Sequence, residues 1–284
     1  MDLRQITVIG SGTMGRGIAQ VAALAGYDTI LHDVEDSMLS SALDAIRNSL
    51  EKAVEKGKLT TTELQSALAR IQPATDLESA AREANLIIEA VPEDFDLKRD
   101  VLSQVDLYCG SDTILASNTS SLSITQLASS VERRDRFIGM HFFNPVPIMK
   151  LVEIVVGERT SNDTTAEIQK VIARMKKEAI IVKDTPGFAT SRLGLAIGLE
   201  AIRMLEDGVA TAADIDRAME LGYNHPMGPL RLTDLIGLDV RLNIATYLAS
   251  TLGARFDPPQ LLRSLVEQGR LGRKSGRGFY EWQE

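Results

Sequence analysis

Short apolar, β-branched runs recur from Ile6 to about Lys183 and alternate with longer stretches of helical periodicity. This alternation predicts a parallel sheet covered by helices on both faces. The first four runs are mostly continuous rather than alternating, as expected of strands buried on both sides. The predicted strands are residues 6–10, 29–32, 86–90, 113–116, 136–140, 151–156 and 179–182.

A long charged stretch, residues 36–69, separates the second and third of these runs. Its composition favours helix, but Gly57 and Lys58 break the pattern. Thr60 followed by Glu63 then has the spacing of a capping box at a second helix start. We therefore predict a helical hairpin inserted between two strands.

Pro186 and Gly187 end the alternation, and every later apolar pattern has a helical period. The predicted helices are residues 188–206, 211–221, 230–252 and 259–268. The best domain boundary therefore lies near residue 185, with a doubly wound α/β domain over 1–185 and an all-helical domain over 186–284. The longest apolar stretch, 193–205, is too short to span a bilayer, so we interpret it as a buried helix and expect no membrane partner.

Composition and charge narrow the class of protein. The chain has 284 residues, of which 44% are hydrophobic and 25% are charged, enough for two globular cores. Its one cysteine, Cys109, cannot form an internal disulfide, and the N-terminal residues lack the features of a signal peptide, so we expect a cytoplasmic location. The net charge of -8 disfavours nucleic acid as a partner. Two basic runs, 52–58 and 270–277, are either solvated faces or local contacts to an anionic ligand.

A glycine motif follows the first predicted strand and opens the first predicted helix. Its residues are Gly10, Ser11, Gly12, Thr13, Met14 and Gly15. The first glycine permits a tight turn, the second lets the backbone approach a pyrophosphate, and the third lets helix and strand pack closely. Because the amides at the helix N-terminus then face the phosphates, the motif predicts a Rossmann-like dinucleotide site.

Asp33 ends the second predicted strand, at a distance from Gly10 that suits the acid which binds the adenosine ribose hydroxyls. A carboxylate there would repel the 2′-phosphate of NADP, so NAD is the expected cofactor. The alternative is a strand-to-helix turn with an incidental aspartate.

Of the three histidines, His141 is the candidate base. His32 adjoins Asp33 on the adenosine side, and His225 lies in a turn-like segment of the helical domain. His141 ends a predicted strand, and open α/β sheets bind ligands beyond the carboxyl ends of their strands. Alcohol oxidation needs a base for the hydroxyl proton, and imidazole suits that role near neutral pH.

Glu153 interrupts the otherwise apolar run 151–156. A carboxylate in such a strand is costly to bury unless it is paired, and His141 is its natural partner. Glu153 would then fix the tautomer of the imidazole and stabilise its charged form. The alternative is an edge strand on which Glu153 faces solvent.

A polar segment, 117–121, follows the fourth predicted strand. Its hydroxyl and amide groups could hold a substrate oxygen, but serine and asparagine also cap helices, and Leu122 onward has a helical pattern. On the residues alone, capping is favoured.

Together these motifs resemble the short-chain L-3-hydroxyacyl-CoA dehydrogenase family, in particular the bacterial 3-hydroxybutyryl-CoA dehydrogenases. The similarity covers nearly the whole chain, at residues 8–33, 89–93, 117–122, 141–147, 186–192, 224–234 and 272–280. The resemblance implies NAD-dependent interconversion of (S)-3-hydroxyacyl-CoA and 3-ketoacyl-CoA, with short substrates such as 3-hydroxybutyryl-CoA and acetoacetyl-CoA. It also implies a Rossmann-like domain with a helical hairpin insertion, followed by a helical domain that forms a homodimer.

The resemblance further implies a role for individual residues. It makes His141 the catalytic acid/base, Glu153 its orienting partner, and Ser120 a donor to the substrate oxygen. For CoA it implies Ser49 and Lys56 on the hairpin, which favours a ligand contact over a solvated face there. For NAD it implies, beside the glycine motif, contacts from Asp33, Glu93, Lys98, Ser120, Asn144 and Lys274.

One position departs from the family pattern. Where the family usually has asparagine in Pro-Gly-Phe-x-x-Asn-Arg, this chain has Ser191. The usual asparagine assists in placing the substrate carbonyl, so the catalytic contribution of Ser191 and the substrate range are in question, whereas the reaction type is not.

Two other functions would share some of these features. A β-hydroxyacid dehydrogenase acting on a free acid would share the first domain but use a lysine as its base. A non-catalytic NAD-binding protein would bind NADH without oxidising it in the presence of a 3-ketoacyl-CoA.

Overall fold

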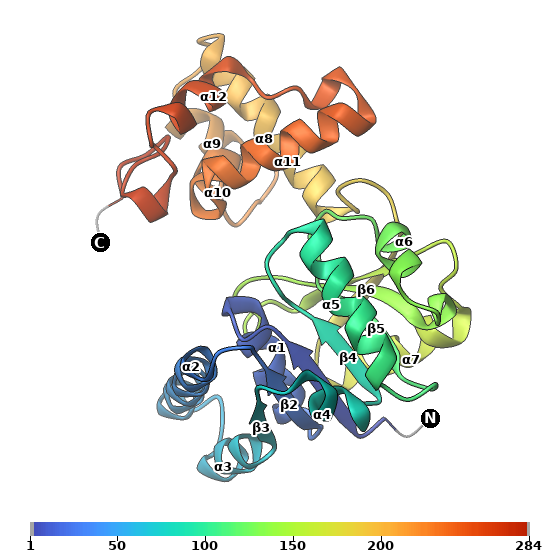
Figure 1. Ribbon diagram of the computed structural model, residues 1–284. Helices are drawn as coiled ribbons and strands as arrows, with labels where there is room; N and C mark the ends of the chain where they lie inside the picture. The colour runs from blue at the N-terminus through green and yellow to red at the C-terminus, as the bar shows by residue number, and fades with distance from the viewer. Residues whose placement is uncertain (1–2, 283–284) are drawn as a thin grey trace. The chain divides into compact units, whose positions relative to one another are not determined.

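The computed structural model describes residues 3–282 (Figure 1). The chain divides into two compact units, Met1–Thr185 and Pro186–Glu284. The first unit is built of strands and helices, and the named elements of the second are all helical. The predicted fold class is confirmed: a doubly wound sheet with a helical hairpin insertion, followed by a helical unit.

The sheet of the first unit has eight strands in the order β3-β2-β1-β4-β5-β6-β7-β8. The strands are β1 Gln5–Ile9, β2 Asp28–His32, β3 Ile71–Ala74, β4 Leu86–Glu89, β5 Ile114–Ser117, β6 Phe137–Phe142, β7 Leu151–Val156 and β8 Glu178–Lys183. β1 pairs with β2 on one side and with β4 on the other, so the strand order reverses beside it. Such a switch point is where open α/β sheets bind their ligands.

β3 was not predicted from the sequence. It contains Gln72 and Pro73 and is only four residues long, so it lacks the apolar run that identified the others. Proline cannot donate a hydrogen bond to a neighbouring strand. β3 lies at the edge of the sheet, where a missing donor is tolerated.

The prediction of a wholly parallel sheet was wrong at β7, which pairs antiparallel with β6. β8 pairs parallel with β7, and all other pairs are also parallel. The physical reason is the short link 143–150 between β6 and β7. A parallel crossover needs about a dozen residues or more, whereas antiparallel neighbours can be joined by a short loop.

Helices cover both faces of the sheet. They are α1 Thr13–Leu24, α2 Asp36–Glu55, α3 Thr61–Ala69, α4 Leu77–Arg82, α5 Phe95–Tyr108, α6 Ile124–Leu127 and α7 Asn162–Arg174. α1, α2 and α7 contribute to one apolar core with the strands, while α5 packs against α4 and α6. The predicted hairpin is α2 and α3, and Thr60 and Glu63 form the expected capping box at the start of α3.

The second unit packs its helices around a core that includes Leu195, Leu199 and Leu248. Its helices are α8 Thr190–Glu206, α9 Ala212–Gly222, α10 Pro229–Ile236, α11 Leu238–Leu252 and α12 Gln260–Glu267. The single helix predicted over 230–252 is two helices, because Gly237 has φ 109°, a backbone conformation outside the helical region.

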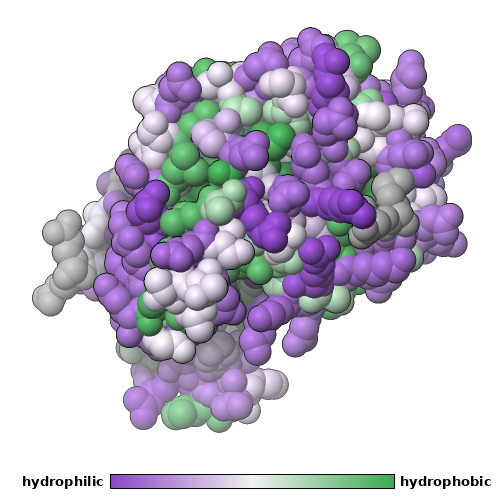
Figure 2. All heavy atoms as spheres, turned by 90° about the horizontal axis from the view of Figure 1, so that it is seen from below, coloured by the Kyte–Doolittle hydropathy of each residue, from purple (hydrophilic) through white to green (hydrophobic). Residues whose placement is uncertain are grey.

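α8 differs from the buried helix that was predicted, because one of its sides is exposed. Leu195 and Leu199 are buried, but Leu193 is 64% exposed on another side of the same helix. Within residues 3–282, no helix is long and apolar enough to cross a membrane. The face of the molecule in Figure 2 is mostly hydrophilic, with apolar side chains gathered in a few places.

Candidate dinucleotide and acid/base site

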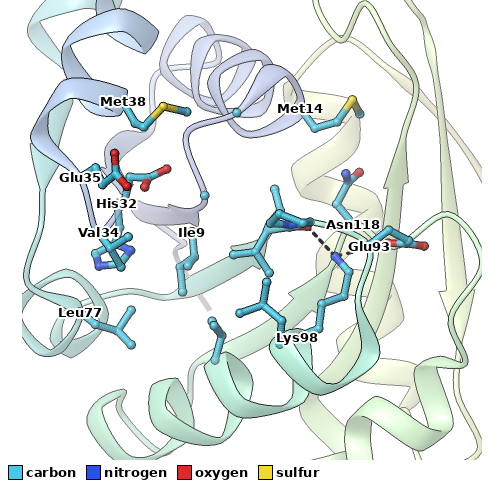
Figure 3. A pocket seen from close by; sticks show the side chains of 18 of the residues that line it. Ile9, Met14, His32, Val34, Glu35, Met38, Leu77, Glu93, Lys98 and Asn118 are labelled. Atoms are coloured by element: carbon cyan, nitrogen blue, oxygen red, sulfur yellow. Dashed lines mark hydrogen bonds and ion pairs between the residues drawn. The ribbon is translucent and has the colours of Figure 1, made fainter.

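A cavity of about 870 Å³ opens at the carboxyl ends of β1, β2, β4 and β5. All the residues that line it belong to the first unit. Figure 3 shows His32, Val34 and Leu77 at one end of this cavity and Asn118, Glu93 and Lys98 at the other. The cavity is therefore long and has two chemically different ends, as an extended dinucleotide requires.

The glycine loop lies along this cavity, and each glycine has its own structural reason. Gly10 has φ 94°, and a Cβ there would lie 2.8 Å from the carbonyl oxygen of Ala90. A Cβ on Gly15 would lie 1.7 Å from the carbonyl oxygen of Gly10, so the backbone leaves no room for a side chain. Gly12 is different, because a Cβ there would have no atom of the described chain within 4 Å. Gly12 faces open space, into which α1 points its N-terminal amides.

Asp33 follows β2 and joins the glycine loop to the cavity wall. Its Oδ2 atom accepts hydrogen bonds from the backbone N–H of Ser11 at 2.8 Å and from the Ser11 hydroxyl at 2.7 Å. Burial alone would raise the pKa of Asp33, but the hydrogen bonds from Ser11 and from the backbone of Glu35 and Val34 together outweigh it and hold the pKa below its usual value. Asp33 is therefore ionised at neutral pH, and Glu35 adds a second carboxylate to the lining of the cavity.

His32 lines the same end of the cavity as Asp33. It is buried, and its Nδ1 has no hydrogen-bond partner among residues 3–282. Burial lowers the pKa of His32, so its imidazole is neutral at physiological pH.

The other end of the cavity holds Asn118 and Ser120. Ser117 donates its hydroxyl hydrogen to Glu89 at 2.6 Å, and Oδ1 of Asn118 accepts from the backbone N–H of Phe142 at 2.9 Å. The residue that caps α6 is instead Ser123. The capping interpretation of the segment 117–121 was therefore wrong for α6, because Ser117 and Asn118 make contacts across the sheet. Thr119 accepts a hydrogen bond from the backbone N–H of Leu122 at 2.9 Å, but Leu122 precedes the helix.

His141 and Glu153 are direct partners across β6 and β7. The Nδ1 atom of His141 lies 2.7 Å from Oε2 of Glu153, and both side chains are buried. β7 lies between β6 and β8 rather than at the edge of the sheet, so the alternative of a solvent-facing Glu153 is excluded. The ring of Phe143 lies against His141 with its centroid 4.5 Å away.

Several residues that the resemblance placed in the site do not line the cavity. Ser49 lies on α2, Lys56 is exposed at its C-terminal end, and Asn144 is exposed in the link after β6. Ser191 and Lys274 belong to the second unit, where Lys274 forms an ion pair with Asp239 at 2.6 Å. Their roles stay predictions.

One group was missed from the sequence. Glu89 is a fully buried carboxylate at the end of β4, and it lies within hydrogen-bond distance of Lys98, Ser117 and the backbone N–H of Val91. The signal was available, since Glu89 ends an apolar run in the way that Glu153 interrupts one. Among the residues that the structure describes, no cluster of histidine, cysteine or acidic side chains is arranged to hold a metal ion.

Comparison with known proteins decides the family. The model of the 3-hydroxyacyl-CoA dehydrogenase NAD-binding domain matches residues 5–185, and that of the C-terminal domain of the same enzymes matches residues 187–282. The chain belongs to the 3-hydroxyacyl-CoA dehydrogenase family. Its first unit is the family's NAD-binding domain, so the expectation of NAD as the cofactor is confirmed.

Individual relatives agree with this assignment. A probable 3-hydroxybutyryl-CoA dehydrogenase of Bacillus subtilis is 46% identical over 285 residues, covering 100% of this chain and 99% of the relative. The crystal structure of an (S)-3-hydroxybutyryl-CoA dehydrogenase from Ralstonia eutropha superposes with a TM-score of 0.97 at 42% identity and covers 100% of both chains. A 3-hydroxyadipyl-CoA dehydrogenase of Escherichia coli is 40% identical over 99% of this chain and 60% of its own length.

Proposed function

We propose that this protein interconverts (S)-3-hydroxyacyl-CoA and 3-ketoacyl-CoA with NAD, and that its substrates are short, such as 3-hydroxybutyryl-CoA and acetoacetyl-CoA. The observation that carries the proposal is the link between the cavity and the buried histidine. Asn118 lines the cavity and binds the backbone of Phe142, the residue that follows His141. The acid/base pair is thereby tied to the end of the cavity opposite Asp33, where the nicotinamide ring would lie.

His141 takes the hydroxyl proton in the oxidising direction and returns it in the reducing direction. With Nδ1–H donated to Glu153, the basic lone pair is on Nε2. The carboxylate of Glu153 fixes this tautomer and stabilises the imidazolium that forms. NAD accepts the hydride from the 3-carbon of the substrate.

The other assignments rest on the same family. Ser120 donates a hydrogen bond to the substrate oxygen, and Ser191 contributes less to catalysis than the usual asparagine. The glycine loop and Asp33 hold the dinucleotide, together with Glu93, Ser120, Asn144 and Lys274. Ser49 and Lys56 bind CoA, for which the exposed ammonium of Lys56 supplies charge complementary to phosphate.

We also propose a cytoplasmic homodimer assembled through residues 186–284. Leu193 and Ile197 lie one turn apart on α8 and are both exposed, as are Leu221 and Tyr223 near the end of α9. Apolar side chains grouped in this way favour a protein partner, and a second copy is the occupant that the family resemblance implies. Sedimentation at several concentrations tests this.

NADH oxidation tests the function. We expect turnover with acetoacetyl-CoA, a dependence of kcat/KM on acyl length across longer 3-ketoacyl-CoA substrates, and no turnover with free 3-ketoacids. NADH binding without oxidation of any 3-ketoacyl-CoA would instead make the chain a non-catalytic dinucleotide-binding protein. Turnover confined to free acids would favour the β-hydroxyacid dehydrogenases.

A further inference from the structure

The carboxylate of Glu89 accepts hydrogen bonds from neighbouring elements of the first unit. It ends β4 and is fully buried. Its Oε1 accepts hydrogen bonds from the backbone N–H of Val91 at 2.7 Å and from Nζ of Lys98 at 2.7 Å. Its Oε2 accepts from the hydroxyl of Ser117 at 2.6 Å, at the end of β5. Burial raises the pKa of Glu89, and the ammonium of Lys98 opposes that rise.

Lys98 lies in α5 and lines the cavity, but its side chain is only 1% exposed. Its Nζ donates to Glu89, donates to the carbonyl oxygen of Val91 at 3.0 Å, and lies 3.5 Å from Oε2 of Glu93. Figure 3 shows this ammonium next to Glu93. The ammonium of Lys98 therefore interacts with Glu89, Val91 and Glu93. In this geometry it is not a free cation that could bind a phosphate.

Glu93 continues the network into the loop that carries Ser120. While Oε2 faces Lys98, Oε1 accepts from the backbone N–H of Ser120 at 2.9 Å and of Ser121 at 3.1 Å. The hydroxyl of Thr119 donates to the same oxygen at 2.6 Å. A carboxylate among successive backbone N–H groups fixes the conformation of that loop.

We propose that Glu89 is a positioning residue that acts through Lys98 on Glu93, and so sets the place of the Ser120 loop at the nicotinamide end of the cavity. The proposal deepens the proposed function and rests on it for the role of Ser120. The ammonium of Lys98 is attracted electrostatically by both carboxylates, Glu89 at 2.7 Å and Glu93 at 3.5 Å. When the buried one is removed, Glu93 is the one anionic neighbour that the ammonium keeps among residues 3–282, and burial penalises a charge that is left uncompensated. The ammonium then draws Oε2 of Glu93 inward, and Oε1 leaves the two amides.

A solely structural role for Glu89 predicts something different. In that case the loss of Glu89 lowers stability, and any fall in activity follows the fraction of unfolded protein. The positioning role instead predicts a local change at Ser120 and Ser121 in the folded protein, together with non-additivity between Glu89 and Lys98. The local change at Ser120 and Ser121 and the non-additivity can both be measured without measuring turnover.

The experiment compares Glu89→Gln, Lys98→Met and the double variant with Thr113→Val in the full chain. Thr113 precedes β5 at the end opposite Ser117, is buried, and donates to the carbonyl oxygen of Ala84 at 2.6 Å. Thr113→Val therefore removes a buried hydrogen bond of the same sheet far from the cavity. The readouts are amide hydrogen exchange at Ser120 and Ser121, the dissociation constant of NADH, thermal unfolding, and kcat and KM for acetoacetyl-CoA.

For Glu89→Gln we expect amide exchange at Ser120 and Ser121 to become about tenfold faster or more, corresponding to 1.4 kcal/mol of local opening. We expect kcat to fall further than KM rises, since the displaced loop carries the donor to the reacting oxygen. Lys98→Met removes the ammonium that would draw Glu93 inward, so the double variant should exchange both amides more slowly than Glu89→Gln alone. Thr113→Val should leave the exchange of both amides unchanged.

Two results overturn the proposal. One is exchange at Ser120 and Ser121 that stays within about twofold of the Thr113→Val value. The other is additivity of the Glu89→Gln and Lys98→Met effects, which shows that the two side chains act independently. If Glu89→Gln does not fold, Ser117→Ala replaces it: it removes the bond to Oε2 together with the 3.3 Å bond that the Ser117 hydroxyl oxygen accepts from the backbone N–H of Thr119, and it should speed exchange in the same direction. Because exchange is measured without substrate, a failure of the proposed reaction leaves this test intact.

Discussion

His141 and Glu153 stand directly opposite each other on two antiparallel strands, and their side chains meet at 2.7 Å in the interior of the protein. The backbone pairing itself places the imidazole and the carboxylate on the same face of the sheet. Their meeting therefore does not depend on loop conformation.

We expect His141→Gln to lower kcat by a factor of about 10² to 10⁴, the usual contribution of a positioned acid/base. Glutamine is uncharged and cannot accept the substrate proton, whereas NADH binding should stay near its wild-type value. Steady-state kinetics and NADH titration provide the measurement. His225→Gln, the same substitution in a loop of the helical unit, is the control. A loss of less than about threefold, with chemistry rate-limiting, would remove His141 from the role of base.

The glycine loop predicts opposite phenotypes for two similar substitutions. Gly12→Ala should cost about 1 kcal/mol of stability or less, because the added methyl group meets open space and only the helix cap is weakened. It should nevertheless weaken NADH binding at least about tenfold by filling the approach to the pyrophosphate. Gly15→Ala should destabilise the fold, since its Cβ would overlap the carbonyl oxygen of Gly10. Thermal unfolding and NADH titration of both variants separate the effects, and unchanged NADH affinity in Gly12→Ala contradicts the proposed phosphate position.

Cofactor choice should depend on Asp33. A carboxylate about 4 Å from a phosphate charge costs roughly 1 to 4 kcal/mol, or tens- to hundreds-fold in affinity, so NAD(H) should be preferred over NADP(H). Asp33→Ser should narrow this ratio without removing it, because Glu35 also lines the cavity. Asp36→Ser is the matched control, since Asp36 begins α2 and does not line the cavity. Equal wild-type efficiency with both cofactors would show that Asp33 does not face the ribose.

Ser191→Asn should raise kcat/KM on acetoacetyl-CoA by the equivalent of about 0.5 to 1.5 kcal/mol, the value of a neutral hydrogen bond. The amide donor of asparagine reaches about one bond further than the serine hydroxyl, so it can contact the substrate directly. Ser191→Ala is the companion variant in the same kinetic assay. If Ser191→Ala matches the wild type and Ser191→Asn is worse, neighbouring residues have adapted to the small side chain and Ser191 has no catalytic role.

Strands with continuous apolar runs were predictable to within one or two residues, because burial on both faces leaves a strong signal. β3 was not predictable in this way, because Gln72 and Pro73 interrupt its apolar pattern. The segment is recognised as a strand only from its pairing with β2. The break at Gly237 was also missed, because a glycine within an otherwise periodic helix can be tolerated and only its φ shows the turn.

The site was predictable where one residue type implies one chemistry, as with the glycine motif and Asp33. The contacts of Glu89 were not, because they join residues from β4, β5 and α5 that are distant in the chain. The direction of β7 could have been predicted, because the link 143–150 is too short for a parallel crossover. It was missed because the alternation of strands and helices indicated a parallel neighbour.

The pairing of β6 with β7 also limits which strand registers are compatible with the contact between His141 and Glu153. Successive side chains of a strand point to opposite faces, so a slip of β7 by one residue against β6 would turn Glu153 away from His141. A slip by two residues would restore the face but move the carboxylate along the strand by about 7 Å, beyond hydrogen-bond reach. Insertions and deletions in the link 143–150 must therefore be absorbed within the link itself, since neither an odd nor an even shift of the strand preserves the pair.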